Sequence, residues 1–432
     1  MSIPRQLDYS PLPSLPQGTR SYSNVIVPVS GGTFSSNQLI QFNLTARQGS
    51  YLVPNSMYLR YTINLAGQSA DADFIGAFPA CSPFIRMETL VQSQVIESIT
   101  NYGVLNNMLL TCKMNYAQKV GLGAMFGIGL TDNTTSLSFQ TCNGHDSIIT
   151  TDTWSMAFPI NNMFANADKL VPIGLIGNTS INLYTDSITN LIVTNATTAP
   201  TAWTLSNLEL CYDTIEFNPQ IDQAVLSMTD ANGKICIKSQ SYITSAQTVQ
   251  SGNISSGTTE YIFSVRLASI KSLFLIGGGN DATKINRLFD SSDVTNGTGE
   301  ISFWIGGLCY PQRPISTTLN KSAVLAELAL AINGSADLSK TNFSITNVEF
   351  QSPLNTKTTT ALQMGKCYFG VNTERLASNQ NLMTGVSSQN SPISVRISTT
   401  TASNKSVTLI LVAQYDALLE IDPATSQVNV LQ

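Results

Sequence analysis

The sequence is poor in charge. Only 11% of its 432 residues are Asp, Glu, Lys or Arg, whereas globular chains carry about 25%. Ser, Thr, Asn and Gln take their place along the whole chain. Hydrophobic residues still make up 42%, which allows sizeable cores and excludes a disordered chain. This composition predicts a surface that is neutral and polar or is largely buried against neighbouring subunits. Because interface cores are depleted of Lys, Glu and Asp, it favours assembly.

Basic residues are few and scattered. The 22 Lys and Arg are outnumbered by 27 Asp and Glu, which gives a net charge of −5. Proteins that grip phosphates need clustered Lys and Arg to release counterions. No such cluster exists here, and the first 24 residues contain only Arg5 and Arg20. We therefore predict no direct sequence-specific nucleic-acid binding.

Catalytic residue patterns are also missing. The one histidine, His145, lies in a loop-like stretch, and no G-x-S-x-G elbow surrounds any serine. Cys142 is its only nearby ligand type, which is too few for zinc. Glu88 and Glu97 are spaced like many chance pairs of carboxylates, so they make a weak glycosidase pair. We predict that the chain is not an enzyme and has no catalytic, cofactor-binding or metal-ligating residues and no cofactor.

Targeting and redox signals are absent as well. The N-terminus has no apolar signal core, and no apolar run reaches the roughly 18 residues that a membrane helix needs. The seven cysteines contain no CxxC pair, which predicts reduced, buried thiols in a chain folded in a cytosol. These cysteines are Cys81, Cys112, Cys142, Cys211, Cys236, Cys309 and Cys367.

Three further motifs have structural explanations. Residues 277–280 (Gly-Gly-Gly-Asn) lack the Lys-Thr/Ser continuation of a phosphate loop and predict a wide turn. Pro311 and Pro314 are expected to end a strand. Asp213 and Asp416 each follow a tyrosine, and we expect each Asp at a strand surface with the Tyr ring packed inward, rather than a bound cation.

The chain is rich in short β-branched and aromatic runs separated by Gly, Asn, Ser and Pro, which is typical of a sandwich or barrel. Residues 58–65 show the period-two alternation of a half-buried strand. Predicted strands cover residues 23–29, 38–44, 57–65, 94–98, 179–184, 191–194, 206–217, 234–238, 240–244, 260–267, 271–276, 300–305, 343–350, 367–371, 393–398 and 406–415.

Two stretches break the β pattern. Apolar residues at three- and four-residue spacing predict a helix over 99–110, and strong helix formers followed by Gly334 predict another over 321–333. Glycines between residues 121 and 129 predict a flexible segment.

A phrase that passes through Tyr-Asp to an acidic residue occurs at 208–217 and again at 412–421. This repetition predicts a duplicated β-domain with a boundary at 218–222. We predict an all-β fold of two tandem eight-stranded jelly-roll barrels with one short helix inserted in each. The predicted parts are a Pro-rich extended arm (1–24), a first jelly roll (25–220) and a second (221–432).

The order of these landmarks resembles the double jelly-roll major capsid proteins of tailless icosahedral DNA viruses, the adenovirus hexon-like lineage. The matching segments are the strand and helix with Asn-Tyr-x-x-Leu at 96–106, the closing strand at 203–217, the Tyr-Pro and Pro-Ile strand end at 306–315 with its following helix, and residues 369–385 with the final strand at 415–421.

The resemblance implies a homotrimer that forms a pseudo-hexagonal capsomer and tiles an icosahedral shell. Its partners would be neighbouring capsomers and minor capsid or penton proteins, with an internal membrane beneath the shell left open. The implied location is the virion capsid, after folding in the host cytoplasm, with the arm reaching under a neighbour or touching an inner layer. The alternatives are a carbohydrate-binding β-sandwich surface protein and a single-shell RNA-virus coat protein, although the latter commonly has a basic arm.

Overall fold

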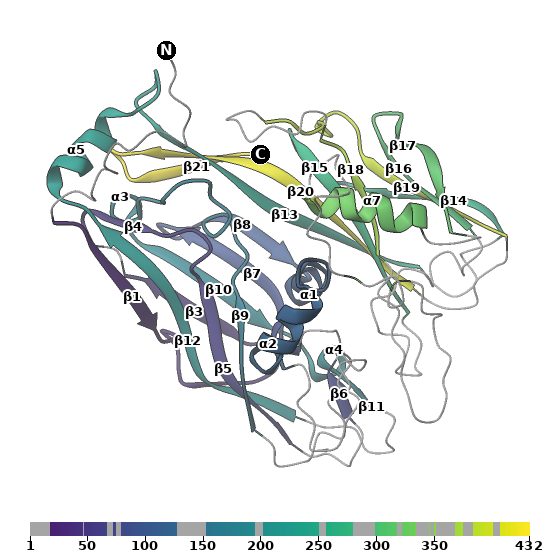
Figure 1. Cartoon of the computed structure of the whole chain (residues 1–432), viewed down its shortest axis with the longest axis horizontal. Helices are drawn as coiled ribbons and strands as arrows, with labels where there is room; N and C mark the ends of the chain where they lie inside the picture. Colours follow the sequence, from purple (N-terminus) through teal and green to yellow (C-terminus); the bar gives the residue numbers. More distant parts are fainter. Residues whose placement is uncertain are drawn as a thin grey trace, which may run out of the picture.

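The computed structural model of the chain describes most residues from 18 onward. The described residues are 18–45, 47–66, 72–74, 79–127, 153–194, 202–249, 256–279, 299–317, 322–333, 345, 350, 368–374, 383–400 and 407–432. They form antiparallel sheets in two sandwiches that lie side by side (Figure 1).

The first sandwich is built from eight principal strands. These are β1 (Arg20–Ile26), β3 (Leu39–Leu44), β5 (Tyr58–Ala66), β7 (Phe84–Val91), β8 (Gln94–Thr100), β9 (Thr153–Pro159), β10 (Thr179–Thr185) and β12 (Ala202–Glu216). One sheet has the order β1-β12-β5-β9 and the other β3-β10-β7-β8. Counted along the chain, the orders are first-eighth-third-sixth and second-seventh-fourth-fifth, which is the strand order of a jelly roll.

The second sandwich repeats this order. Its strands are β13 (Ile235–Val249), β14 (Gly257–Phe263), β15 (Ile270–Gly279), β16 (Gly299–Ile305), β17 (Leu308–Ser316), β18 (Phe369–Asn372), β19 (Ile393–Thr399) and β20 (Val407–Asp422). The sheets read β13-β20-β15-β18 and β14-β19-β16-β17, which is again first-eighth-third-sixth and second-seventh-fourth-fifth. We call the two units roll 1 and roll 2.

Shorter elements extend the two rolls. In roll 1, β2 (Thr33–Phe34) and β4 (Ser50–Leu52) pair with β12, and β6 (Ala72–Phe74) pairs with β11 (Ile192–Thr194). In roll 2, β21 (Gln427–Leu431) pairs with β20. Short helical turns are η2 (Pro79–Cys81), α3 (Ile173–Ile176) and α4 (Ile188–Leu191).

The longer helices occupy equivalent places in the two rolls. Helices α1 (Tyr102–Lys113) and α2 (Tyr116–Phe126) follow the fifth strand of roll 1, and α7 (Ser322–Asn333) follows the fifth strand of roll 2. The two copies of the Tyr-Asp phrase lie on β12 and β20, the eighth strand of each roll. This equivalence is what a duplicated domain predicts.

The prediction of two tandem eight-stranded jelly rolls is confirmed, and so is the helix predicted over 321–333. The helix predicted over 99–110 exists but is displaced by three residues, because Ile99 and Thr100 still belong to β8. Roll 1 contains more helix than the single one expected. Gly121 and Gly123 lie in α2, so the prediction of a flexible segment there is wrong. Tertiary packing of the buried Phe126 against the core offsets the low helix propensity of glycine. Residues 128–150, which include His145 and Cys142, lie outside the described residues.

Two turn predictions are also wrong. Gly277 to Gly279 continue β15 opposite Leu409 to Val407, because β20 offers them backbone partners. Pro311 and Pro314 lie inside β17 instead of ending it. β17 is the last strand of its sheet, and an edge strand tolerates proline because the missing N–H can face outward.

The strand predictions mostly hold to within a few residues. β5 alternates as expected, with Leu59, Tyr61 and Ile63 buried between more exposed neighbours. The runs 234–238 and 240–244 form the single strand β13. Of the run 343–350, only residues 345 and 350 are described. Residues 1–17 of the predicted arm lie outside the described part, and residues 20–24 pair with β12 in β1. A further helix, α5 (Pro219–Ser227), begins with an Asn218 cap at the predicted boundary.

The cysteine prediction holds in part. None of the five cysteines in the described region forms a disulfide, and Cys81, Cys112 and Cys211 among them are buried. Cys236 and Cys309 are only half-buried. Cys142 and Cys367 lie outside the described residues.

Candidate functional site: a buried seam between the two rolls

Roll 1 meets roll 2 along β13, the first strand of roll 2. The contacting parts of roll 1 are β8 and the segment 160–168, which follows β9. We call this contact the seam. It brings together buried polar groups from distant parts of the chain, so it is the candidate functional site.

A carboxylate lies at the centre of the seam. Glu97 on β8 is buried and accepts a hydrogen bond from Ser241 Oγ on β13. The backbone N–H of Met163 donates to both of its oxygens at 3.0 Å, and Thr89 Oγ1 donates at 2.9 Å. These donors come from both rolls, so Glu97 fixes their relative position.

No cation is paired with Glu97 in the described part of the chain. Burial therefore dominates, and it raises the pKa of Glu97 to about 7, while the three hydrogen bonds act in the opposite direction. Two tyrosines face the same carboxylate. Burial, with a smaller contribution from Glu97, raises the pKa of both Tyr102 and Tyr415.

Hydroxyl groups and one backbone carbonyl of β13 complete the polar part of the seam. Ser239 Oγ donates to Met163 O at 2.5 Å, and the N–H of Asp168 donates to Lys238 O at 2.9 Å. Thr244 Oγ1 donates to Thr100 O at 2.7 Å. The exposed edge that a first strand would present is thus covered by roll 1.

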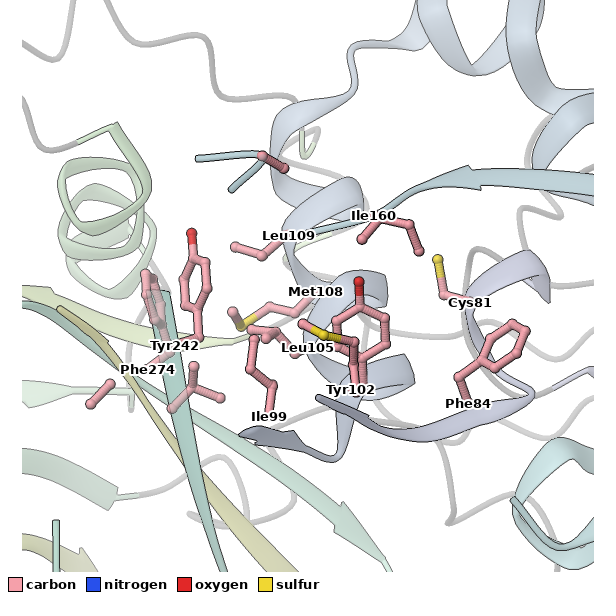
Figure 2. Packing of buried hydrophobic residues seen from close by; sticks show 14 of the residues in the cluster. Cys81, Phe84, Ile99, Tyr102, Leu105, Met108, Leu109, Ile160, Tyr242 and Phe274 are labelled. Atoms are coloured by element: carbon pink, nitrogen blue, oxygen red, sulfur yellow. The ribbon is translucent and has the colours of Figure 1, made fainter. Parts of the chain in front are cut away.

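The apolar part of the seam adjoins Glu97. Figure 2 shows Ile99, Met108 and Leu109 of roll 1 on the side facing Tyr242 and Phe274 of roll 2. All five belong to one continuous buried cluster that includes residues of both rolls. Because both rolls contribute to the same core, they form a single packed body.

Glu88 and Glu97, the two carboxylates considered as a glycosidase pair from the sequence, lie apart in the structure. Thr89 lies opposite Glu97, and Glu88 lies opposite Ser98, so Glu88 and Glu97 point to opposite faces of their sheet. Glu88 instead pairs with Arg86 and accepts from the Tyr184 hydroxyl at 2.8 Å. The two groups cannot act together on one glycosidic bond.

The two Tyr-Asp pairs behave differently. On β12, Tyr212 is buried and Asp213 is exposed, as predicted. On β20, both Tyr415 and Asp416 are buried, so the surface position predicted for Asp416 is wrong. Its partners are Lys238 and Lys271, and sequence reasoning missed this cluster because its members lie far apart in the chain.

Other classes of site find little support in the described residues. No group of three or more His, Cys, Asp or Glu there could hold a metal ion. No described helix is long and apolar enough to cross a membrane. Beside the seam, a cavity of about 690 Å³ is lined by mostly apolar groups together with Lys169, Lys238 and Cys236.

Comparison with known proteins identifies the fold. No family model and no curated protein matches the sequence. Among solved structures, the Faustovirus major capsid protein matches with a TM-score of 0.65 at 9% identity, covering 95% of this chain and 92% of that one. The PBCV-1 virus capsid model gives 0.58 at 8%, covering 98% and 99%. The mavirus major capsid protein gives 0.52 at 10%, covering 100% and 95%. The chain therefore has the double jelly-roll fold of these viral capsid proteins.

Proposed function

We propose that this chain is a major capsid protein that assembles as a homotrimer into pseudo-hexagonal capsomers of an icosahedral virus shell. The observation that carries the proposal is the repeated strand order of the two rolls, joined through a seam into one body. The match extends over almost the full length of capsid proteins of this fold. The proposed role is structural and requires no catalytic group.

The seam indicates how copies would associate. Within one chain, the fifth strand of roll 1 (β8) and the segment after its sixth strand lie against the first strand of roll 2 (β13). In roll 2 the strand equivalent to β8 is β17, and in roll 1 the strand equivalent to β13 is β1. Neither of these two strands takes part in the seam within one chain. Both are edge strands of their sheets. We propose that β17 of one copy lies against β1 of the next, which repeats the seam between copies.

The surfaces of these two strands fit that role. Val25 on β1, and Val27 and Val29 just after it, are 50%, 66% and 60% exposed, so apolar side chains are exposed along and just beyond this edge strand. On β17, Leu308 is 56% exposed. Contact between different surfaces on the two partners is heterologous and closes into a ring when the rotation allows. Three copies place six rolls in such a ring.

Finer features of the proposal follow from this assembly. The rolls would comprise residues 25–220 and 221–432, except that residues 20–24 of the predicted arm at 1–24 belong to β1 of the first roll; the part of the arm that precedes β1 would extend beneath a neighbouring copy. The capsomers would contact one another and minor capsid or penton proteins in the virion, above an internal membrane where one is present. The chain would fold in the host cytoplasm before assembly.

Light scattering after size-exclusion chromatography, together with negative-stain microscopy, tests the proposal. We expect a particle of three chains with a hexagonal outline. A stable monomer that binds glycans would instead support the carbohydrate-binding alternative. That alternative needs exposed aromatic rings on which a sugar can stack. The Arg396 guanidinium lies 4.1 Å from the centroid of the Trp304 ring, so one face of this ring is occupied.

A further inference from the structure

The buried charges around Asp416 form the most unusual cluster in the described residues. We call Lys238, Lys271, Glu374 and Asp416 the roll 2 charge cluster. The Asp416 side chain is fully buried, that of Glu374 is 4% exposed and that of Lys271 is 13% exposed. Removing charges from water costs desolvation free energy, and the attraction within an ion pair offsets that cost only when good hydrogen bonds accompany it. The cluster lacks such bonds at the decisive atom.

That atom is Asp416 Oδ1. It is buried, and no hydrogen-bond donor in the described structure reaches it. The two nearest cations are Lys238 Nζ at 3.7 Å and Lys271 Nζ at 3.8 Å, both beyond hydrogen-bond distance. An unpaired carboxylate oxygen aimed at two amines has little value as an ion pair.

The other oxygen of the same carboxylate is held firmly. Ser269 Oγ donates to Asp416 Oδ2 at 2.9 Å, and the N–H of Thr384 donates to it at 3.3 Å. Ser269 Oγ is fixed in turn, because it accepts from the N–H of Gly385 at 2.9 Å. Two fixed donors on one oxygen, and none on the other, polarise the carboxyl group in the way an oxyanion hole polarises a carbonyl.

The backbone also directs one of the lysines toward this carboxyl. Ile270 lies opposite Tyr415 and Ser272 lies opposite Gln414, so Lys271 is an extra residue on β15 without a partner on β20. Such a bulge re-aims a side chain. Lys271 Nζ also lies 3.4 Å from Glu374 Oε1, and Thr384 Oγ1 donates to that same Glu374 oxygen. The amine therefore lies near both a carboxyl carbon and a second carboxylate that can accept its proton.

We propose that Lys271 and Asp416 join in an intramolecular isopeptide bond, with Glu374 as the proton carrier. Glu374 removes a proton from the Lys271 ammonium and passes it to Asp416 Oδ1, and the neutral amine then attacks Cγ of the resulting carboxylic acid. Negative charge develops on Oδ2 beside Ser269 and Thr384. The C–Oδ1 bond then breaks, and Oδ1 leaves as water with two protons from the amine, relayed by Glu374. One ammonium and one carboxylate become an amide plus water, and no oxidant or cofactor is required.

Charge balance favours the product. Before the reaction the cluster contains two cations and two anions. Afterwards Lys238 and Glu374 remain as one cation and one anion, and the orphaned Oδ1 is gone. The bond would connect β15 to β20, the neighbouring strands at the centre of the roll 2 sheet. The buried position limits access of water to the amide and hence its hydrolysis.

Mass spectrometry of the purified full-length chain tests the proposal directly. We expect an intact mass lower than the sequence mass by one water molecule. Trypsin should then fail to cut after Lys271 and should release a branched peptide that joins residues 267–284 to residues 406–432. The branch survives denaturation, which an ion pair cannot do.

Three conservative variants assign the roles. Lys271→Arg keeps the charge and should abolish the branch. Glu374→Gln should slow its formation by about a hundredfold or more. Lys238→Arg changes the other cation, which lies 3.7 Å from Asp416 Oδ1 against 3.8 Å for Lys271, and should leave the branch intact.

The opposite results are equally clear. A wild-type chain at full sequence mass, cleaved normally after Lys271, would reduce the cluster to ion pairs and overturn the proposal. A branch at Lys238 would overturn the choice of lysine. A branch that forms at the wild-type rate in Glu374→Gln would overturn the proton-carrier role. None of these results depends on the capsid function.

Discussion

The last strands of the two rolls have similar sequences and opposite environments. On β12 buried and exposed residues alternate over most of the strand, whereas nearly every residue from Val407 to Leu419 on β20 is buried or half-buried. β20 lies inside its sheet, between β13 and β15, and helix α7 covers β15 and the next strand, β18. The difference shows that the repeated sequence determines the strand and its place in the sheet. The elements packed around the strand determine which of its residues are exposed to solvent.

The buried carboxylates extend this contrast. In roll 1, Glu97 is held by uncharged donors and has no cation. In roll 2, Asp416 lies between two lysines. Burial raises the pKa of Glu97, whereas the Asp416 carboxylate has two amines at 3.7 and 3.8 Å from its Oδ1. The predictions below test this contrast, beginning with the largest expected effect.

Removing the carboxylate from each Tyr-Asp pair should give unequal results. Asp416→Ala removes the carboxylate that lies between Lys238 and Lys271, together with the bond proposed above, and leaves Glu374 as the anion beside Lys271, so we expect a loss of about 3–5 kcal/mol in the free energy of unfolding. Asp213→Ala, at the exposed equivalent position, should change it by less than about 0.5 kcal/mol. Urea denaturation of both variants measures this difference. Equal losses would mean that the environments of the two strands do not decide the outcome.

Stability should depend on pH through Glu97. Its pKa is about 7 in the folded chain and near 4.5 when unperturbed, so the folded state binds more protons between these values. Stability should therefore be highest below pH 4.5 as far as Glu97 is concerned and should fall as the pH rises to 7, by about 3 kcal/mol in total.

Glu97→Gln is the matched control, because it keeps the shape of the side chain and cannot ionise. Melting temperatures measured from pH 5 to pH 8 should decline less in Glu97→Gln than in the wild type. Parallel profiles for the two proteins would show that Glu97 does not titrate in this range.

The helices of roll 1 allow a glycine comparison that roll 2 does not offer, since α7 contains none. A Cβ on Gly103 would lie 2.6 Å from the backbone oxygen of Cys81, whereas nothing lies within 4 Å of one on Gly121. Gly103→Ala should cost about 1–3 kcal/mol, and Gly121→Ala should add about 0.5–1 kcal/mol. Thermal unfolding of the two variants checks both signs. Stabilisation by both would show that α1 can move away from Cys81 at little cost.

Charges on the free edges should affect assembly and spare folding. Val27→Asp on the β1 side and Leu308→Asp on β17 each alter an exposed residue, so the free energy of unfolding should stay within about 0.5 kcal/mol of the wild type. Each should shift the trimer toward monomer in sedimentation velocity, because a charge is then buried in an apolar contact. Unchanged trimers in both variants would remove β1 and β17 from the interface.

Much of the fold could be predicted from the sequence because its evidence is local. The alternation in β5, the helix formers of α7 and the repeated Tyr-Asp phrase each lie within a few neighbouring residues. The seam could not be predicted in this way. Glu97 and Ser241 are separated by 144 residues, and nothing near either one indicates the other. The same holds for Asp416 and Lys271. Their contact depends on a bulge in β15, which no local sequence pattern predicts.

The shared core has a consequence for anyone who tries to divide the molecule. A chain cut at α5 would leave Ile99 and Met108 on one fragment, and Tyr242 and Phe274 on the other, in contact with solvent. Each fragment would then aggregate, or would stay soluble only after it binds the other fragment. Foreign peptides are better grafted into peripheral loops, and the two halves, produced separately, are candidates for a reporter that refolds only when mixed.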